Sequence, residues 1–301
     1  MAEGSRREKF CDVCGKPENR SHPMICTNRF WGSTYCQEHK HDNTASCCSC
    51  QRFQGRRVKY VDVGDGRKLC PDCLSASIMD TRKCEPLARG MYEFFNNTLN
   101  LKFETYVPVL LVDKEELLRC VLHGRRPQPN RRHGLGTIAA VPQNITTVVK
   151  CAQRGDEIEV VKEVVHVTGR KVTAIVIIYG LPMVTTGVIM AHEMMHAWIR
   201  QQGWFVRLER KVEEGMCQLI SRMWLEGFAS DDQFTKSLRE MSIFYIENDG
   251  HGKEIYGDGF REAKQAVDKY GLKTTLKHIA KTGSFNPPPA RVPAGCFCFQ
   301  A

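Results

Sequence analysis

Residues 191–198 read AHEMMHAW and contain the pattern His-Glu-x-x-His. No helix breaker stands between Gly187 and Gly203, which predicts a helix of roughly four turns over residues 186–202. On that helix His192 and His196 lie one turn apart on one face, so both imidazoles can reach one zinc ion. Glu193 can then reach a zinc-bound water without coordinating the metal, which is the general-base position of a metallopeptidase.

A zinc peptidase of this kind needs a third protein ligand. The metzincin continuation His-x-x-Gly-x-x-His is missing after His196, which excludes that subclass. A glutamate on the next helix would instead make a gluzincin, and residues 212–218, VEEGMCQ, offer two. Helical periodicity places Glu213 nearer the centre of the apolar face. The motif favours Glu214, because gluzincins place this ligand directly before a small residue, here Gly215, which lets the two helices approach closely.

We choose Glu214 as the third ligand. Glu213 then lies behind the ligands or at the surface, and Gln218 would accept the free N–H of a ligand histidine. Three protein ligands leave one zinc position open for water, as catalysis requires. In the implied mechanism zinc polarises the scissile carbonyl, and Glu193 takes the proton of the water and passes it to the leaving amine.

The composition is that of a soluble globular protein of 301 residues, with 42% hydrophobic and 26% charged residues. The N-terminal sequence MAEGSRREKF has no apolar signal-peptide core, and no stretch reaches the length of a membrane span. We therefore expect a reducing compartment and no membrane partner. There the fifteen cysteines are better explained as zinc ligands than as disulfides.

The first 84 residues hold ten of the fifteen cysteines and four pairs of the type Cys-x2-Cys or Cys-x2-His. Each pair at this spacing can present two ligands to one tetrahedral zinc ion, so their order predicts two successive sites. The predicted ligands are Cys11, Cys14, Cys36 and His39 in the first site, and Cys47, Cys50, Cys70 and Cys73 in the second. So small a segment buries little apolar core, and zinc would supply most of its folding free energy.

Some finger assignments stay open. Cys48 could replace Cys47, and His41 could replace His39, although the two-residue spacing favours the pairs given above. Cys26 and Cys84 fit no pair and are interpreted as buried thiols. The spacing is similar to that of a LIM domain. Because the third and fourth ligands run Cys then His, and the spacer between the sites is longer, we call the segment LIM-like.

The formal charge of +9 raises the question of a nucleic-acid partner. Seven zinc-bound thiolates would cancel most of the excess positive charge of residues 1–84. Residues 123–133 carry four arginines among prolines and a glycine, and we interpret them as an exposed loop rather than an anion site. We therefore expect no nucleic-acid partner.

Between the fingers and the histidine motif, the sequence predicts helices and strands. An amphipathic helix is expected after Pro86, and Asp113 predicts a capped helix that follows a strand over 107–112. Two β-branched runs, 157–167 and 171–179, are joined by Thr-Gly-Arg, which predicts a hairpin. The second run leads into the motif helix, so we expect it to border the cleft as an edge strand that pairs with an extended substrate.

After the glutamate helix, the sequence predicts helices over 231–247, 260–270 and 272–281. The glycine-rich stretch between the first two could fold over the cleft and offer Tyr256 or His251 to an oxyanion. A connector without a catalytic role is the plainer interpretation of the same stretch. We interpret the end of the chain, from residue 287 to 301, as a disordered tail.

The order of modules, fingers and then His-Glu-x-x-His, resembles the plant DA-type peptidases, which contain LIM domains and are activated by ubiquitin. The similarity runs from about Cys11 to Phe285. It is densest in CCSC at 47–50, GRKLCPDC at 66–73, AHEMMHAW at 191–198, VEEGMCQ at 212–218 and YGDGFR at 256–261. These strings are longer and more specific than the zinc motif alone.

By position, the resemblance implies that His192 and His196 are ligands, that Glu193 is the base and that Glu214 is the third ligand. Members of this family are cytosolic or nuclear, cleave ubiquitin ligases, a ubiquitin protease and transcription factors, and limit cell proliferation and organ size. They usually begin with ubiquitin-interacting motifs and an additional LIM domain. This chain starts almost at the second finger, so we expect a shortened form that lacks both.

These features predict an α+β fold with a two-zinc LIM-like domain over 1–84, a gluzincin-type peptidase domain over 85–286 and the tail. The peptidase domain would combine a small sheet with the motif helix and the glutamate helix. The expected activity is a zinc endopeptidase, with one catalytic and two structural zinc ions, that cleaves regulatory proteins in the cytoplasm or the nucleus. Ubiquitin and ubiquitin ligases are expected as further partners.

The rival interpretation is a non-catalytic, LIM-like interaction module, such as a decoy or a paralogue associated with immune receptors. In that case the histidine site would be structural or idle. The intact Glu193 favours the enzyme, because a merely structural site has no use for a base.

Overall fold

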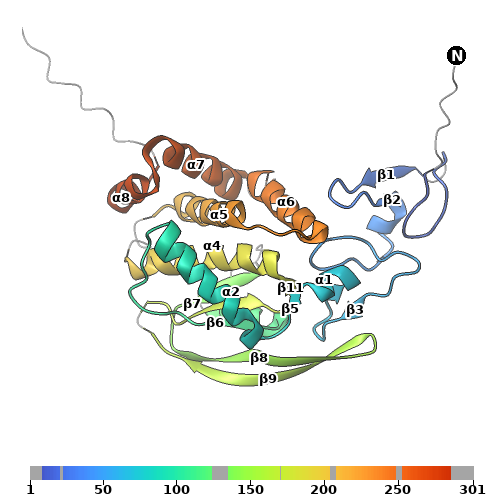
Figure 1. Cartoon of the computed structure of the whole chain (residues 1–301), viewed down its shortest axis with the longest axis horizontal. Coiled ribbons are helices and arrows are strands. Elements are labelled where there is room, and N and C mark those ends of the chain that lie inside the picture. The colour runs from blue at the N-terminus through green and yellow to red at the C-terminus, as the bar shows by residue number, and fades with distance from the viewer. Residues whose placement is uncertain are drawn as a thin grey trace, which may run out of the picture.

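The computed structural model describes residues 9–20, 23–123, 135–169, 171–203, 208–248 and 253–285. The basic stretch 124–133, His251 and the predicted tail 287–301 lie outside these residues. Helices and strands form separate layers, so the α+β fold predicted from the sequence is confirmed (Figure 1).

The N-terminal part consists of short elements around two groups of cysteines. In chain order they are β1 (Met24–Thr27), β2 (Thr34–Cys36), a 3-10 turn (Gln37–Lys40), β3 (Val61–Asp62), β4 (Lys68–Leu69), α1 (Pro71–Ser75) and β5 (Ser77–Ile78). β1 pairs with β2, whereas β3 and β5 pair with strands from later in the chain. Elements on the two sides of residue 84 therefore share sheets, and the domain boundary there stays a prediction.

The later strands belong to three sheets. They are β6 (Val109–Val112), β7 (Gly136–Ala139), β8 (Gln143–Arg154), β9 (Glu157–Val167), β10 (Ala174–Ile178) and β11 (Leu181–Pro182). β10 lies at the centre of a three-stranded sheet, parallel to β6 and antiparallel to β7. β8 and β9 form a long antiparallel ribbon that continues through β3 to β4, and β11 pairs with β5.

Two strand predictions are wrong. The runs 157–167 and 171–179 do not form a hairpin, because β9 pairs with β8 and the chain then crosses into a different sheet. The second run is also not an edge strand, because β10 has a neighbour on each side. Among the described strands of this sheet, β7 and β6 form the edges.

The central strand β10 is buried on both faces, which explains its continuous apolar sequence. Ile175 and Ile177 pack into the core on the helical side, whereas Ala174, Val176 and Ile178 pack against α3 and the β8–β9 ribbon. Because neighbouring side chains of a strand point to opposite faces, a strand between two layers needs apolar residues at every position.

The helices stack mostly on one side of this sheet (Figure 1). They are α2 (Thr81–Glu93), α3 (Lys114–His123), α4 (Met183–Gln201), α5 (Arg210–Gly227), α6 (Gln233–Asn248), α7 (Asp258–Tyr270) and α8 (Leu272–Thr282), with π-helical turns at Phe94–Thr98 and Lys253–Gly257. The histidine helix α4 lies between the sheet and the layer that α5 and α6 form. Among the described helices, none combines the length and the apolar character that crossing a membrane requires.

The starts of α2 and α3 are each capped by an aspartate side chain. Asp113 accepts the N–H of Glu116 at 2.8 Å, which confirms the cap predicted for α3. The predicted start of α2 after Pro86 is wrong, because Asp80 accepts the N–H of Lys83 at 3.0 Å and starts the helix earlier. Pro86 therefore lies inside α2.

Glycines allow two close helix contacts. A Cβ added at Gly187 on α4 would lie 2.1 Å from the ring of Trp224 on α5. A Cβ at Gly215 would lie 2.3 Å from the carbonyl oxygen of Gly259 on α7. Gly215 therefore allows α5 to approach α7, not α4 as predicted. The close approach between α4 and α5 depends on Gly187.

The cysteine-rich segment rests on α6 through aromatic side chains. The ring of Trp31 lies 5.2 Å from that of Phe234, and the ring of Phe30 lies 5.6 Å from that of Phe244. The guanidinium of Arg52 lies over the rings of both Trp31 and Phe234. The finger segment is thus packed against the helical layer.

Candidate metal centre

Helix α4 brings the two motif histidines together as predicted. The Nε2 atoms of His192 and His196 lie 3.2 Å apart, and the side chain of His196 is almost fully buried. Their spacing of four residues places the two rings on one helix face. The next helix, α5, packs along this face and supplies the other groups of the site.

Glu214 completes a cluster of three donor atoms. Its Oε2 lies 3.2 Å from His192 Nε2 and 3.4 Å from His196 Nε2. Tetrahedral zinc with bonds of 2.0–2.1 Å would hold its donors about 3.3 Å apart, so these three atoms fit a zinc ion. Burial alone would raise the pKa of Glu214, but its contacts with the two histidine rings outweigh it and hold that pKa far below its usual value.

Cys217, which lies on α5 one turn after Glu214, was not predicted from the sequence as a member of the site. Its Sγ and the ring nitrogens of His192 and His196 all lie within 4.8 Å of one another. Burial raises the pKa of Cys217 to about 12. The carboxylate oxygen of Glu214 lies 3.2 and 3.4 Å from the two ring nitrogens, the donor spacing of tetrahedral zinc, and is therefore the better third ligand. The helical spacing from Glu214 was the one signal that could have identified the thiol beforehand.

The other nitrogen of His196 contacts Glu213. Nδ1–H of His196 donates to Glu213 Oε1 at 2.7 Å, and Arg200 Nη2 lies 4.0 Å from the same oxygen. Burial would raise the pKa of Glu213, but the hydrogen bond from His196 outweighs it and lowers that pKa. The acceptor role predicted for Gln218 at a ligand histidine is thus taken by Glu213 at His196.

Glu193 is half-buried and lies beside strand β7. A Cβ added at Gly136, the first residue of β7, would lie 3.2 Å from Glu193 Cγ and 2.6 Å from Ile189 Cγ2. Without a side chain at this position, the edge strand runs directly against α4 at the proposed base. Strand β7, which in the described part of the sheet pairs only with β10, therefore passes close to Glu193.

Tyr256 is not in an irregular loop as predicted but in a π-helical turn. Its hydroxyl lies 3.5 Å from Arg210 Nη2, and Arg210 Nε lies 3.7 Å from Glu214 Oε1. Tyr256 is therefore connected to the outer oxygen of Glu214 through Arg210. The alternative candidate, His251, lies outside the described residues.

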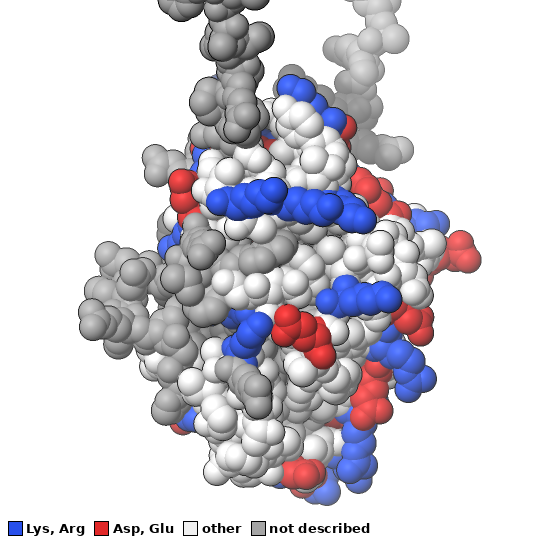
Figure 2. All heavy atoms as spheres, turned by 90° about the vertical axis from the view of Figure 1, so that its left-hand side faces the viewer, with Lys and Arg blue, Asp and Glu red and all other residues white. Residues whose placement is uncertain are grey.

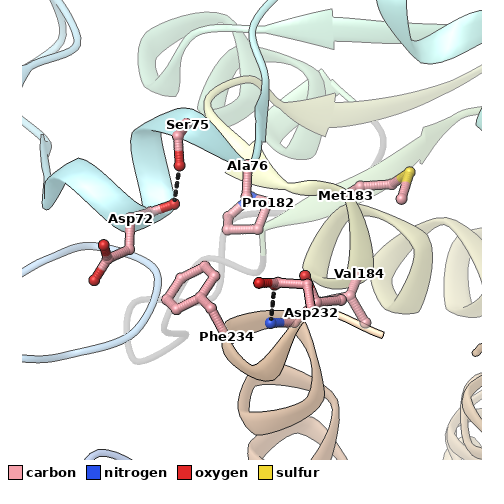
Figure 3. A pocket seen from close by; sticks show the side chains of 9 residues that line it. Asp72, Ser75, Ala76, Pro182, Met183, Val184, Asp232 and Phe234 are labelled. Atoms are coloured by element: carbon pink, nitrogen blue, oxygen red, sulfur yellow. Dashed lines mark hydrogen bonds between the residues drawn. The ribbon is translucent and has the colours of Figure 1, made fainter. Parts of the chain in front are cut away.

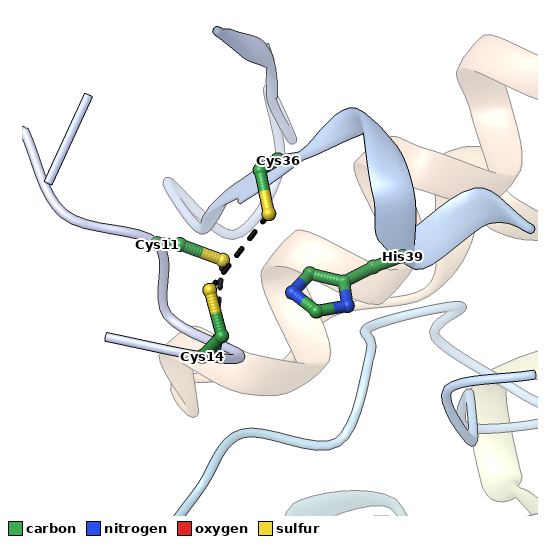
Figure 4. Close-up of side chains that lie close together, drawn as sticks. All are labelled: Cys11, Cys14, Cys36 and His39. Atoms are coloured by element: carbon green, nitrogen blue, oxygen red, sulfur yellow. Dashed lines mark hydrogen bonds between the residues drawn. The ribbon is translucent and has the colours of Figure 1, made fainter. Parts of the chain in front are cut away.

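The first finger cluster has the predicted membership. The four side chains converge in Figure 4, and their donor atoms lie within 4.8 Å of one another. Cys14 Sγ and Cys36 Sγ are 3.8 Å apart, close to the spacing of about 3.8 Å that Zn–S bonds of 2.3 Å produce in a tetrahedron. Nδ1 of His39 pairs with Asp42, whereas its buried Nε2 has no hydrogen-bond partner among the described residues. That orphaned atom fits a metal ligand, and His41 is not part of the cluster.

The second cluster contains Cys47, Cys50, Cys70 and Cys73, all buried, and not the alternative Cys48. The Sγ atoms of Cys50 and Cys70 are 3.7 Å apart. Both clusters are thus compatible with zinc binding.

The side chain of Arg52 contacts the second cluster. Its guanidinium donates to the sulfurs of Cys50 and Cys70 at 3.2 Å and to Asp72 at 2.7 Å. Hydrogen bonds of this kind partly neutralise thiolates.

The unpaired thiols differ. Cys84 is buried, and burial raises its pKa to about 12, as expected for an inert core thiol. The side chain of Cys26 is not among those described.

A cavity lies elsewhere, where α1, the start of α4 and the start of α6 meet (Figure 3). It encloses about 460 Å³ and is lined by residues such as Asp72, Pro182, Phe234 and Asp232. None of its lining residues belongs to the three clusters of metal-binding side chains. The cavity is therefore separate from the candidate metal sites.

Figure 2 shows a row of basic side chains across the upper part of one face, with basic and acidic side chains mixed below it. Helix α8 carries three exposed lysines at intervals of four residues, Lys273, Lys277 and Lys281. A row of lysines on a helix is the ordinary character of a solvated face. The absence of a nucleic-acid partner stays a prediction.

The chain is similar in sequence to a set of related plant proteins. A family model described as Protein DA1 (DA1-like) matches residues 98–233 and 227–282. The chain is 39% identical to Protein DA1-related 1 and 38% identical to Protein DA1, both of Arabidopsis thaliana, over 91% and 93% of its length. It is 34% identical to the LIM domain-containing protein HDR3 of Oryza sativa subsp. japonica over 91% of its length.

The chain spans 55%, 58% and 61% of the length of these three relatives, respectively. No solved structure matches it. The residues that the family model matches include the histidine helix and the glutamate helix. The chain belongs to the DA1 family.

Proposed function

We propose that this chain is a zinc endopeptidase of gluzincin type, with one catalytic and two structural zinc ions. The observation that carries the proposal is the cluster of His192 Nε2, His196 Nε2 and Glu214 Oε2, whose separations of 3.2–3.4 Å match a tetrahedral zinc ion. The neighbouring Glu193 gives this cluster a carboxylate that none of the three ligand contacts uses. A purely structural site would not need it.

Zinc bound there would polarise the scissile carbonyl and lower the pKa of a coordinated water to roughly 7. Glu193, next to the first ligand on α4, would accept the proton of the attacking water and transfer it to the leaving nitrogen. Tyr256 would donate its hydroxyl to the developing oxyanion, and its contact with Arg210 would orient that hydroxyl.

Substrate would bind as an added strand on the edge of β7. This strand lies beside Glu193, and in the described part of the sheet it is paired on one side only, with β10. Main-chain hydrogen bonds would provide most of the affinity, with little demand on side-chain identity. This edge replaces the strand over 171–179 that the sequence favoured.

Membership in the DA1 family supports a role in growth regulation. We propose that the substrates are regulatory proteins, that cleavage limits cell proliferation and organ size, and that ubiquitin or ubiquitin ligases act as partners in the cytoplasm or the nucleus. The names of the relatives do not specify substrates, so these proposals rest on the resemblance drawn from the sequence.

The test compares the wild-type chain with two variants by mapping new protein termini in a plant-cell extract. Glu193→Gln should retain zinc and lose cleavage, because the ligands remain and the base is removed. His196→Ala should lose cleavage and about one zinc equivalent. Glu226→Gln, an exposed change on α5, serves as the control and should behave as the wild type. Cleavage by Glu193→Gln at the wild-type rate would refute the peptidase and favour the interaction module.

A further inference from the structure

We propose that Glu213, held in place by Arg200, is a positioning residue that fixes the ring of His196 for metal binding. The inference rests on the proposed zinc site and goes beyond it, because neither residue is a ligand or the base. It gives a role to Glu213, the neighbour of the proposed ligand Glu214.

The two ring nitrogens of His196 have different partners. Nε2 faces His192 and Glu214, whereas Nδ1 lies 2.7 Å from Glu213 Oε1. A carboxylate at Nδ1 keeps the proton on that nitrogen, which leaves the lone pair on Nε2 for the metal. It also raises the basicity of the ring and limits its rotation.

Glu213 is itself contacted by two side chains of α4. Only 14% of its side chain is exposed, and Arg200 Nη2 lies 4.0 Å from the oxygen that accepts from His196. Arg200 follows His196 by one turn of α4, so two side chains of α4 contact the carboxylate of Glu213 on α5. Glu213 thus ties the orientation of the ligand to the packing of α4 on α5.

Arg200 also places a positive charge near the carboxylates of the site. Glu193, Glu213 and Glu214 concentrate three carboxylates around one small site, and a buried carboxylate without a partner is costly. Arg200 lies near Glu213 and Arg210 lies near Glu214. Glu213 and Glu214 therefore each lie near an arginine of their own.

The experiment measures zinc affinity of the full chain by competition with a chromophoric chelator. The zinc ions of the cysteine clusters serve as an internal reference. Glu213→Ala should weaken one zinc equivalent by about 10- to 100-fold, and Glu213→Gln should weaken it less, because the amide oxygen can still accept from Nδ1. Arg200→Met should change affinity in the same direction. The exposed control Glu226→Gln should change nothing.

A structural role between helices would give a different result. We therefore also measure urea unfolding of the chain with its histidine site free of metal. If Glu213 positions the ligand, Glu213→Gln loses stability mainly in the metal-loaded protein. An equal loss in both forms, with unchanged zinc affinity, would overturn the inference and leave the zinc site intact. A wild-type chain that binds no metal at the histidines would instead overturn the proposed function, and this inference with it.

Discussion

Gly215 offers a sharp test of the packing around the glutamate helix. In Gly215→Ala, the new Cβ would lie 2.3 Å from the carbonyl oxygen of Gly259 and 2.5 Å from its carbonyl carbon. These are backbone atoms of α7, so no side-chain rotation can relieve the contact. The two helices must separate by about 1 Å to restore an ordinary van der Waals distance.

The expected magnitude follows from two opposing terms. Replacing a helical glycine by alanine stabilises a helix by about 1 kcal/mol. Overpacking a close contact costs about 1–3 kcal/mol, and a rigid backbone contact belongs at the upper end. We therefore expect Gly215→Ala to reduce the free energy of unfolding by about 2 kcal/mol.

Gly90→Ala is the matched control. Gly90 lies near the end of α2, is exposed, and an added Cβ would meet no heavy atom within 4 Å beyond its own helix and neighbours. The same chemical change should stabilise the chain by about 0.5–1 kcal/mol there. In urea unfolding at fixed zinc concentration, Gly215→Ala should have a lower free energy of unfolding than the wild type, and Gly90→Ala a higher one. If Gly215→Ala is as stable as the wild type, the α5–α7 contact is not as close as described.

Elemental analysis of the purified chain should find about three zinc ions, and a content of one would contradict the two finger sites. Glu214→Gln should weaken zinc binding more than Glu213→Gln, since only Glu214 faces both histidines; the reverse order in a competition titration would make Glu213 the ligand. A peptide-library profile should show weak side-chain preference, and a strict requirement at one position would argue against strand pairing at β7. Burial would raise the pKa of Asp113, but the N–H of Glu116 and the ammonium of Lys162 outweigh it and lower that pKa. Asp113→Asn should therefore cost about 1 kcal/mol at pH 7, and the wild-type advantage should vanish as pH falls below about 4 through the lowered pKa. An equal difference at pH 7 and pH 3 would show that the charge of Asp113 is not involved.

The site could be predicted from the sequence wherever local spacing determines geometry. Four residues along a helix place His192 beside His196, and two-residue knuckles place cysteine pairs together, so these groups lie where their spacing predicts. The choice of Glu214 over Glu213 needed the motif, because periodicity pointed the other way. The structure explains this conflict: α5 is buried on several sides, and both carboxylates point inward, one to each nitrogen of His196.

What could not be predicted depends on partners that are distant in the sequence. The apolar run that became β10 shows that a strand exists but not that β6 and β7 occupy both of its edges. Gly215 correctly signals a close contact, yet nothing in its neighbours identifies Gly259 as the partner. Pro86 is usually a helix boundary, and here the cap at Asp80 starts the helix before it.

The aromatic contact between the fingers and α6 has a practical consequence for preparing the protein. A chain that started after residue 84 would leave Phe234 and Phe244 facing water, because Trp31 and Phe30 would be missing. It would also remove β5, the partner of the strand that enters the histidine helix. We expect such a truncated chain to aggregate. Adding detergent would not replace the missing strand β5. The finger segment therefore covers aromatic side chains of α6 that would otherwise face water.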